Sequence, residues 1–346
     1  MSELRQNILT GNWVVIAPER GQRPEGLQVS AQKNLDDNPV YDAACPFCPG
    51  NQMEKDHAIV EEISNTAGEW SVRVVENKYK IFDQHEACSG TMQPFNHYGP
   101  YVYYHGCGEH YLVIEHRAHN LVMGAMNDES LRDVFACYLE SSRRLRSHPG
   151  NMIVLLFKNQ GVKAGASQPH PHSQIVGSRV VPSWIRNALH VQEGYFDTKG
   201  SCALCDIIHF ECREKIRVIK ETELVVALSP YAAGNPYEVW VVPKRHFSCY
   251  VDIDRDTLSE LSAMVGCILR AYVNYLGNPD FNYFIHSSPF PLTGVPYYHL
   301  YVQIIPRIQE IGGFEIGTRI PVNSVLPEDA MRLYANIVDG TKGVNP

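Results

Sequence analysis

The chain has 346 residues, of which 44% are hydrophobic and 20% are charged, and its formal net charge is −8. This composition predicts a folded protein large enough for two domains, and the negative charge argues against a broad nucleic-acid-binding surface. No run of about 18 apolar residues occurs and the opening residues are polar, so we expect neither a membrane span nor a secretory signal and predict a cytoplasmic location.

The first Cys-x-x-Cys pair, Cys45 and Cys48, precedes a series of predicted elements. Segment 111–119 is an apolar strand ending at His119. Residues 127–145 follow with capping residues and apolar side chains at helical spacing, and 152–157 is a second apolar strand. In a chain of this length without a secretory signal, such a cysteine pair favours metal binding over a disulfide framework.

Segment 166–177, ASQPHPHSQIVG, places nitrogen-bearing side chains at every second position. Side chains alternate between the two sides of an extended backbone, so His170, His172 and Gln174 are predicted to share one side. One small site could therefore use all three.

The same order of parts recurs after a second Cys-x-x-Cys pair, Cys202 and Cys205. A strand ending at His246, a helix and two further strands are predicted at 238–246, 252–276, 281–286 and 297–306. In the last of these strands, His299, Tyr301 and Gln303 take the places of His170, His172 and Gln174. We interpret the two stretches as an internal duplication.

Metal sites are the simplest explanation of the repeated cysteines and histidines. Two thiolates and two imidazoles suit a tetrahedral zinc ion, and four protein ligands leave no position for a reactive water. We therefore expect two structural zinc sites per chain, with iron an alternative at the second. The expected ligands are Cys45, Cys48, His119 and His170 in the first unit, and Cys202, Cys205, His246 and His299 in the second.

The two units differ at one chemically important position, where His172 of the first unit is Tyr301 in the second. A neutral imidazole is a competent nucleophile near neutral pH when its other nitrogen donates a fixed hydrogen bond. We therefore predict that the chemistry lies in the first unit, on His172.

The stretch HPHSQ, with the upstream CPFC and His119, resembles the galactose-1-phosphate uridylyltransferase branch of the histidine-triad superfamily. The resemblance implies that His172 attacks the α-phosphorus of a nucleoside diphosphate hexose such as UDP-glucose, while Gln174 donates its amide to a phosphoryl oxygen. A hexose 1-phosphate would then take the nucleotide in a second, ping-pong step, without a redox cofactor. A homodimer is implied as well, with residues of the partner chain helping to bind the sugar.

The resemblance also implies substrate contacts at named positions. Arg20 and Arg23 would reach the nucleotide phosphates, because a guanidinium binds phosphate in a bidentate way. The remaining positions match residues near the ribose or phosphates, or near the hexose: Asn77, Asn159, Gly165, Ser167, Phe314 and Gly317.

The C-terminal stretch GGFEIGTRIPVN departs from the well-studied uridylyltransferases, which hold the hexose with lysine, tyrosine and glutamate. Gly313, Thr318 and Arg319 stand in those places, so an ADP-glucose phosphorylase, which moves an adenylyl group to inorganic phosphate, stays an open alternative. A non-catalytic, zinc-stabilised nucleotide-binding protein is an alternative of another class. A phosphohydrolase is disfavoured because Gln174 replaces the third histidine of that branch.

The fold that these elements predict is of the α+β class. We expect two tandem histidine-triad-like domains, each with an antiparallel sheet and a packed helix. Residues 1–195 would form the catalytic domain, and residues 196–346 would form a related domain without the nucleophile.

Overall fold

The structure is a computed structural model that describes residues 1–22, 38–51, 58–82, 96–148 and 150–338. Within these residues, ten strands form one antiparallel sheet. Five adjacent strands belong to the first unit: β3 (Ile59–Ser64), β4 (Trp70–Glu76), β7 (Gly108–Ile114), β9 (His172–Ser178) and β8 (Ile153–Gln160). The other five belong to the second: β10 (Val218–Glu221), β11 (Val225–Leu228), β12 (Val239–Pro243), β14 (Tyr301–Pro306) and β13 (Phe281–His286).

The two sets of strands have the same internal order, and they join through antiparallel pairing of β8 with β13. Each set also places one long helix on the sheet, so the predicted α+β fold with two histidine-triad-like units is confirmed. The predicted boundary after residue 195 falls inside helix α2 (Ser183–Lys199) and stays a prediction.

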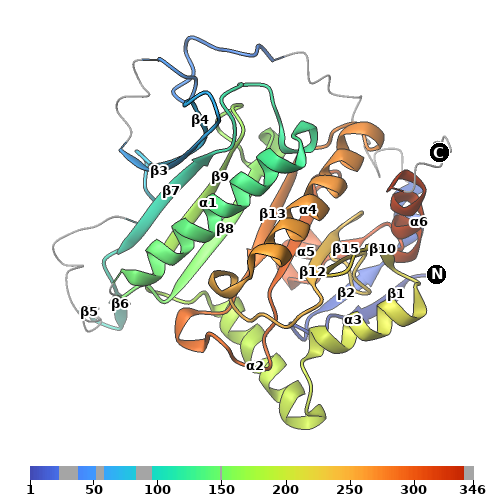
Figure 1. Cartoon of the computed structure of the whole chain (residues 1–346). Coiled ribbons are helices and arrows are strands. Elements are labelled where there is room, and N and C mark those ends of the chain that lie inside the picture. The colour runs from blue at the N-terminus through green and yellow to red at the C-terminus, as the bar shows by residue number, and fades with distance from the viewer. Residues whose placement is uncertain (23–37, 52–57, 83–95, 149, 339–346) are drawn as a thin grey trace.

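Helices α1 (Asp128–Ser147) and α4 (Arg255–Tyr275) lie side by side across one face of the sheet (Figure 1). Asn127 caps α1 by accepting a hydrogen bond from the Ser130 amide at 2.8 Å, and Asp254 caps α4 through the Thr257 amide at 2.8 Å. The apolar sides of both helices pack with the sheet in one core that spans the two units. This core leaves the opposite face of the sheet for the candidate sites.

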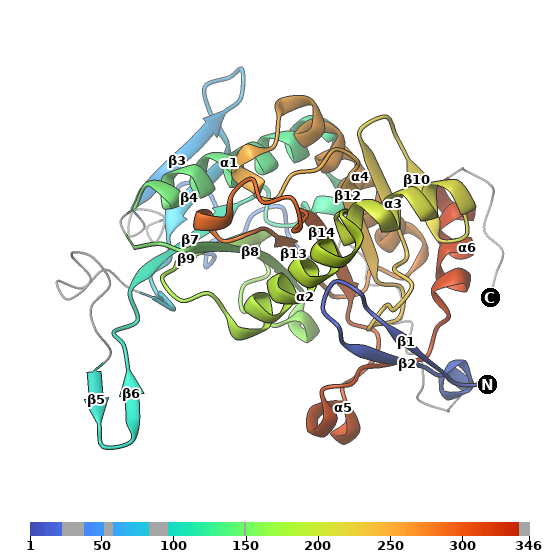
Figure 2. The ribbon, with the colours of Figure 1, turned by 90° about the horizontal axis from the view of Figure 1, so that it is seen from below.

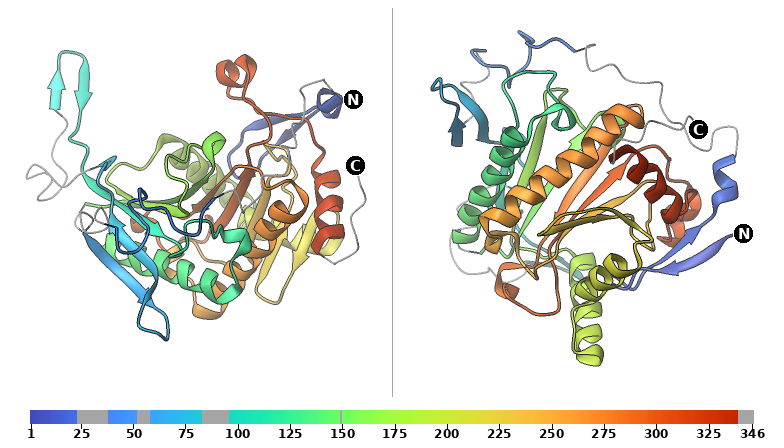
Figure 3. Two further views of the ribbon diagram at one scale, coloured as in Figure 1. Left: turned by 90° about the horizontal axis from the view of Figure 1, so that it is seen from above. Right: turned by 45° about the vertical axis from the view of Figure 1, so that its right-hand side comes forward.

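The remaining elements surround this sheet (Figure 2). They are β1 (Glu3–Gln6), β2 (Trp13–Ile16), η1 (Pro18–Gln22), η5 (Met123–Ala125), η6 (Val162–Ala164), α3 (Ala203–Glu214), η7 (Tyr250–Asp252), η8 (Phe290–Leu292), α5 (Gly313–Thr318), β15 (Val322–Asn323) and α6 (Pro327–Val338). A hairpin of β5 (Asn96–Tyr98) and β6 (Tyr101–Tyr103) stands away from the body (Figures 2 and 3). Helix α5 also projects from the body, beside β1 and β2 (Figure 2).

Candidate active site and metal centres

The four metal ligands predicted for the first unit lie together and are buried. The ligand atoms of Cys45, Cys48, His119 and His170 are all within 4.8 Å of one another. Cys45 Sγ is 3.6 Å from His170 Nδ1, and Cys48 Sγ is 3.5 Å from His119 Nδ1. The sheet creates this cluster, because His119 follows β7 and His170 precedes β9, which are paired strands.

This geometry fits a tetrahedral cation. Zinc bonds of about 2.3 Å to sulfur and about 2.0–2.1 Å to nitrogen place adjacent ligand atoms about 3.5 Å apart, close to the separations found here. His170 Nε2 donates to the carbonyl of His116 at 2.8 Å, which directs Nδ1 toward the thiols. Burial lowers the pKa of His170 to about 4 and raises the pKa of the Cys45 thiol to about 11, so a bound cation would be needed to hold that thiolate.

The second unit gathers three of its four predicted ligands. Cys202, Cys205 and His246 form one group, in which Cys205 Sγ is 3.4 Å from His246 Nδ1. The ring of His299 lies 4.9 Å from that of His246, but its Nδ1 donates to the Leu300 carbonyl at 2.8 Å. Its Nε2 is buried and has no hydrogen-bond partner among the described residues. His299 therefore stays a prediction as the fourth ligand.

Metal content tests this arrangement. We expect two metal ions per chain in the purified protein and one in the Cys202→Ser variant, because each ion depends on its own thiolate pair. His299→Ala should release the second ion at a lower chelator concentration than the first. Elemental analysis of dialysed protein measures both effects, and a Cys202→Ser variant that keeps two ions would contradict the second site.

His172 is the first residue of β9 and is only 5% exposed. Its Nδ1 donates to the carbonyl of His170 at 2.9 Å, which leaves Nε2 as the nitrogen with a free lone pair. Burial lowers the pKa of His172, so the ring is neutral near pH 7. Phe47, between the two cysteines of the first metal group, contacts this ring with centroids 5.5 Å apart. The loop that carries Cys45, Phe47 and Cys48 therefore supports the ring of the predicted nucleophile.

A fully buried ion pair lies behind the predicted nucleophile. Lys158 of β8 donates to both oxygens of Glu115, at 2.9 and 2.7 Å, and to the main-chain carbonyl of His172 at 3.2 Å. Ser173 donates to Glu115 and lies 2.6 Å from the hydroxyl of Tyr138 in α1. This network fixes the backbone that carries His172, and burial lowers the pKa of Lys158 against the opposing effect of Glu115.

The ion pair makes Lys158 a sensitive position for stability. Lys158→Met should lower the free energy of unfolding by about 3–5 kcal/mol, because it leaves a buried carboxylate without its partner. Lys163→Met, at an exposed position in η6, is the control and should change it by less than about 0.5 kcal/mol. Urea denaturation measures both, and equal effects would contradict the predicted energetic role of the pair.

Comparison with known proteins adds the decisive observation. Residues 1–182 match the model of the galactose-1-phosphate uridyl transferase N-terminal domain, and residues 188–333 match that of its C-terminal domain. The chain belongs to the galactose-1-phosphate uridyl transferase family. The predicted family and the predicted enzyme class, a nucleotidyltransferase, are confirmed.

Relatives with two different enzyme names align with nearly the whole chain. ADP-glucose phosphorylase of Arabidopsis thaliana is 32% identical, over 97% of this chain and 93% of that protein. Galactose-1-phosphate uridylyltransferase of Thermotoga maritima is 26% identical, over 96% and 97%. The crystal structure of the Arabidopsis phosphorylase with bound ADP-glucose has a TM-score of 0.82 at 30% identity and covers 97% of this chain and 98% of that one.

Some of the substrate-binding positions predicted in this uridyl transferase family member lie near the strands of the first unit. Asn159 of β8 accepts a hydrogen bond from Asn282 at 2.8 Å, and Gly165 has a φ of 85°, a conformation that favours glycine. Ser167 is exposed in the loop that leads to His170. Asn77 Oδ1 accepts from the Tyr79 amide at 2.9 Å, so its position in a turn already explains that oxygen. Their contacts with substrate stay predictions.

The other predicted substrate-binding positions do not lie near the strands of the first unit. Arg20 is exposed in η1, and no described residue accepts a hydrogen bond from its side chain. Arg23 lies outside the described residues. Phe314 is 51% exposed on the projecting helix α5, which also carries Gly317. Within one chain, the structure gives Arg20, Phe314 and Gly317 no contact with His172.

Three polar residues around His172 and Gln174 were missed by the sequence reasoning: His110, Glu115 and Lys158. Each is buried, and each contacts the strand that holds the predicted nucleophile. A weak indication of two of them is present in the sequence. Glu115 interrupts the predicted apolar strand 111–119, and Lys158 directly follows the predicted apolar strand 152–157. Their pairing depends on strand register, which the sequence alone does not provide.

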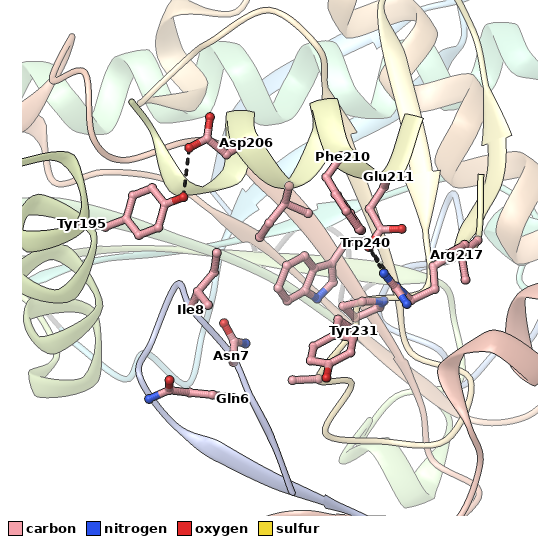
Figure 4. A pocket seen from close by; sticks show the side chains of 14 residues that line it. Gln6, Asn7, Ile8, Tyr195, Asp206, Phe210, Glu211, Arg217, Tyr231 and Trp240 are labelled. Atoms are coloured by element: carbon pink, nitrogen blue, oxygen red, sulfur yellow. Dashed lines mark hydrogen bonds and ion pairs between the residues drawn. The ribbon is translucent and has the colours of Figure 1, made fainter. Parts of the chain in front are cut away.

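A cavity of about 700 Å³ lies between the second unit and the N-terminal segment that carries Gln6, Asn7 and Ile8 (Figure 4). Its lining includes four aromatic residues, Tyr195, Phe210, Tyr231 and Trp240. Tyr195 donates to Asp206 at 2.9 Å on one wall (Figure 4). None of the described predicted site residues lines this cavity, which is therefore separate from the site around His172.

Across the described residues, no helix combines the length and the apolar character needed to cross a membrane.

Proposed function

We propose that the chain transfers a nucleoside monophosphate from a nucleoside diphosphate hexose through a covalent bond to His172. The observation that carries this proposal is the state of one ring. Nδ1 of His172 donates to the His170 carbonyl at 2.9 Å, while Nε2 has no hydrogen-bond partner among the described residues. A neutral imidazole fixed in this way presents a lone pair to an electrophile.

In the first step, Nε2 of His172 forms a bond to the α-phosphorus, and the bond from that phosphorus to the bridging oxygen breaks. The leaving hexose 1-phosphate takes the electron pair. The His170 carbonyl accepts the hydrogen bond of the imidazolium that results, and Gln174 donates to a phosphoryl oxygen. In the second step, an oxygen of the acceptor phosphate attacks phosphorus, the P–N bond breaks, and neutral His172 returns.

ADP-glucose is the proposed donor and inorganic phosphate the proposed acceptor. The support is the 32% identity to the Arabidopsis ADP-glucose phosphorylase, against 26% for the Thermotoga uridylyltransferase. Gly313, Thr318 and Arg319 also depart from the residues with which uridylyltransferases hold the hexose. Uridylyl transfer from UDP-glucose to a hexose 1-phosphate is the second candidate. It is favoured because the motif of this chain reads HPHSQ, whereas ADP-glucose phosphorylase is associated with HSHSQ.

Zinc is the proposed ion at both metal groups, where it would fix the loops that carry its ligands without joining the reaction. A homodimer is proposed as well. Its support is the exposure of Arg20 and of Phe314 on a helix that projects from the body, since a second chain could receive both beside its own His172.

Product analysis tests the proposed donor and acceptor. The protein should convert ADP-glucose and phosphate to ADP and glucose 1-phosphate, and the rate with UDP-glucose and galactose 1-phosphate should be at least about tenfold lower. The reverse order of rates would support the second candidate. No product from either pair would favour the non-catalytic nucleotide-binding alternative.

A further inference from the structure

The side chain of Gln174 is held by a residue that the proposed reaction has not yet used. His110 of β7 lies diagonally across the strand pair from Gln174, because Leu112 is the residue directly opposite Gln174. His110 Nε2 is 2.8 Å from Gln174 Oε1. His110 is 2% exposed, so its ring is shielded from solvent, whereas Gln174 is half-buried.

The backbone determines which nitrogen of His110 carries the proton. The amide of Ile81 donates to His110 Nδ1 at 3.1 Å, so Nδ1 must be the acceptor nitrogen of a neutral ring. Nε2 then carries the hydrogen and donates to Gln174 Oε1. Burial lowers the pKa of His110, and nearby Lys80 acts in the same direction, so the ring stays neutral.

This contact leaves one end of the Gln174 amide available. With Oε1 bound to His110, the Nε2 group is the free end, and no described residue accepts a hydrogen bond from it. Gln174 and His172 are two residues apart on β9 and therefore point to the same side of the sheet. The amide hydrogens are thus on the side where His172 presents its own Nε2.

The second unit provides an internal comparison. Gln303 occupies the place of Gln174, and Trp240 lies opposite it, so Glu238 corresponds to His110. Gln303 Nε2 donates to Glu238 at 2.7 Å, and His286 Nε2 lies 2.8 Å from Gln303 Oε1. Both ends of this amide are occupied in the unit where Tyr301 replaces the nucleophile. A donor at position 110, in place of a carboxylate, is therefore what leaves the first amide free.

We propose that His110 is a positioning residue that fixes the orientation of the Gln174 amide, so that its hydrogens face the phosphoryl group during transfer to His172. This inference rests on the proposed function. Without the hydrogen bond from His110, the amide can turn and present its oxygen to a negatively charged phosphoryl oxygen, which is repulsive.

Kinetics of four variants test this role. His110→Phe should lower kcat by about 10–100-fold while KM for the nucleotide sugar changes by less than about threefold, because a misdirected donor affects the transition state most. His110→Gln keeps an N–H donor and should recover at least part of the loss. In a Gln174→Ala background, adding His110→Phe should lower kcat by less than about twofold, because the two residues act as one unit.

The matched control is His286→Phe, which removes the same histidine contact from Gln303 in the second unit and should leave kcat within about twofold. Independent, multiplying losses from His110→Phe and Gln174→Ala would overturn the inference, as would an unchanged kcat in folded His110→Phe. Failure of the proposed function is distinguishable from failure of this inference. If the proposed function is wrong, even the unaltered protein forms no nucleotidyl adduct.

Discussion

Replacing His172 with glycine is expected to lower the rate of nucleotidyl transfer by roughly 10⁴-fold or more. The variant lacks the nitrogen that forms the bond to phosphorus, and β9 contains no second histidine that could replace it. Stability should change little by comparison, because the substitution leaves the metal ligands and the Lys158–Glu115 pair intact. Initial rates with saturating nucleotide sugar measure the loss, and thermal unfolding reports on the fold.

Tyr301→Phe provides the control for that experiment. Tyr301 occupies the place of His172 in the second unit and stacks on His286, with ring centroids 4.2 Å apart. Its replacement should leave the rate within about twofold, since Phe preserves the stacked ring. A His172→Gly variant that retains a tenth of the activity would show that His172 is not the nucleophile.

Loss of the first metal site is expected to lower the stability of the protein strongly. Cys48→Ser removes a fully buried ligand, and we expect the free energy of unfolding to fall by at least about 3 kcal/mol, because metal binding is coupled to folding. Activity should fall too, since Phe47 contacts the His172 ring and we expect the proposed ion to fix the loop that carries Phe47. Calorimetry, elemental analysis and an activity assay on the same sample measure these three quantities.

Cys137→Ser separates the metal effect from simple replacement of a buried thiol. Cys137 is fully buried in α1 and lies outside both metal groups. We expect this variant to keep two ions per chain and to lose less stability than Cys48→Ser. Full metal content in Cys48→Ser would show that Cys48 is not required for metal binding.

Much of the fold could be predicted because its signals are local and repeated. The capping residues and the apolar spacing of 127–145 predict α1, and the repeated apolar spacing in 252–276 predicts α4. The repeated Cys-x-x-Cys and histidine positions predict two related units before any contact is known. The repetition strengthens the interpretation of each of these residues as a metal ligand, since a single cysteine pair would have indicated little.

The rest depends on contacts that no local pattern encodes. Lys158 and Glu115 are charged residues that are usually exposed, and their burial follows only from the pairing of β7, β9 and β8. The sequence also could not indicate that His299 would direct Nδ1 to its neighbour's carbonyl. Such side-chain orientations follow from packing around each ring, which residue spacing does not describe.

The most direct test of the central claim is a search for the covalent intermediate on His172. The protein is mixed with ADP-glucose, and separately with UDP-glucose, in the absence of any acceptor, and is then digested under mildly alkaline conditions for mass spectrometry. We predict one nucleoside monophosphate on the peptide that contains His172, and its loss when phosphate is added. An adduct on another residue, or catalytic turnover without any adduct, would contradict the proposed mechanism.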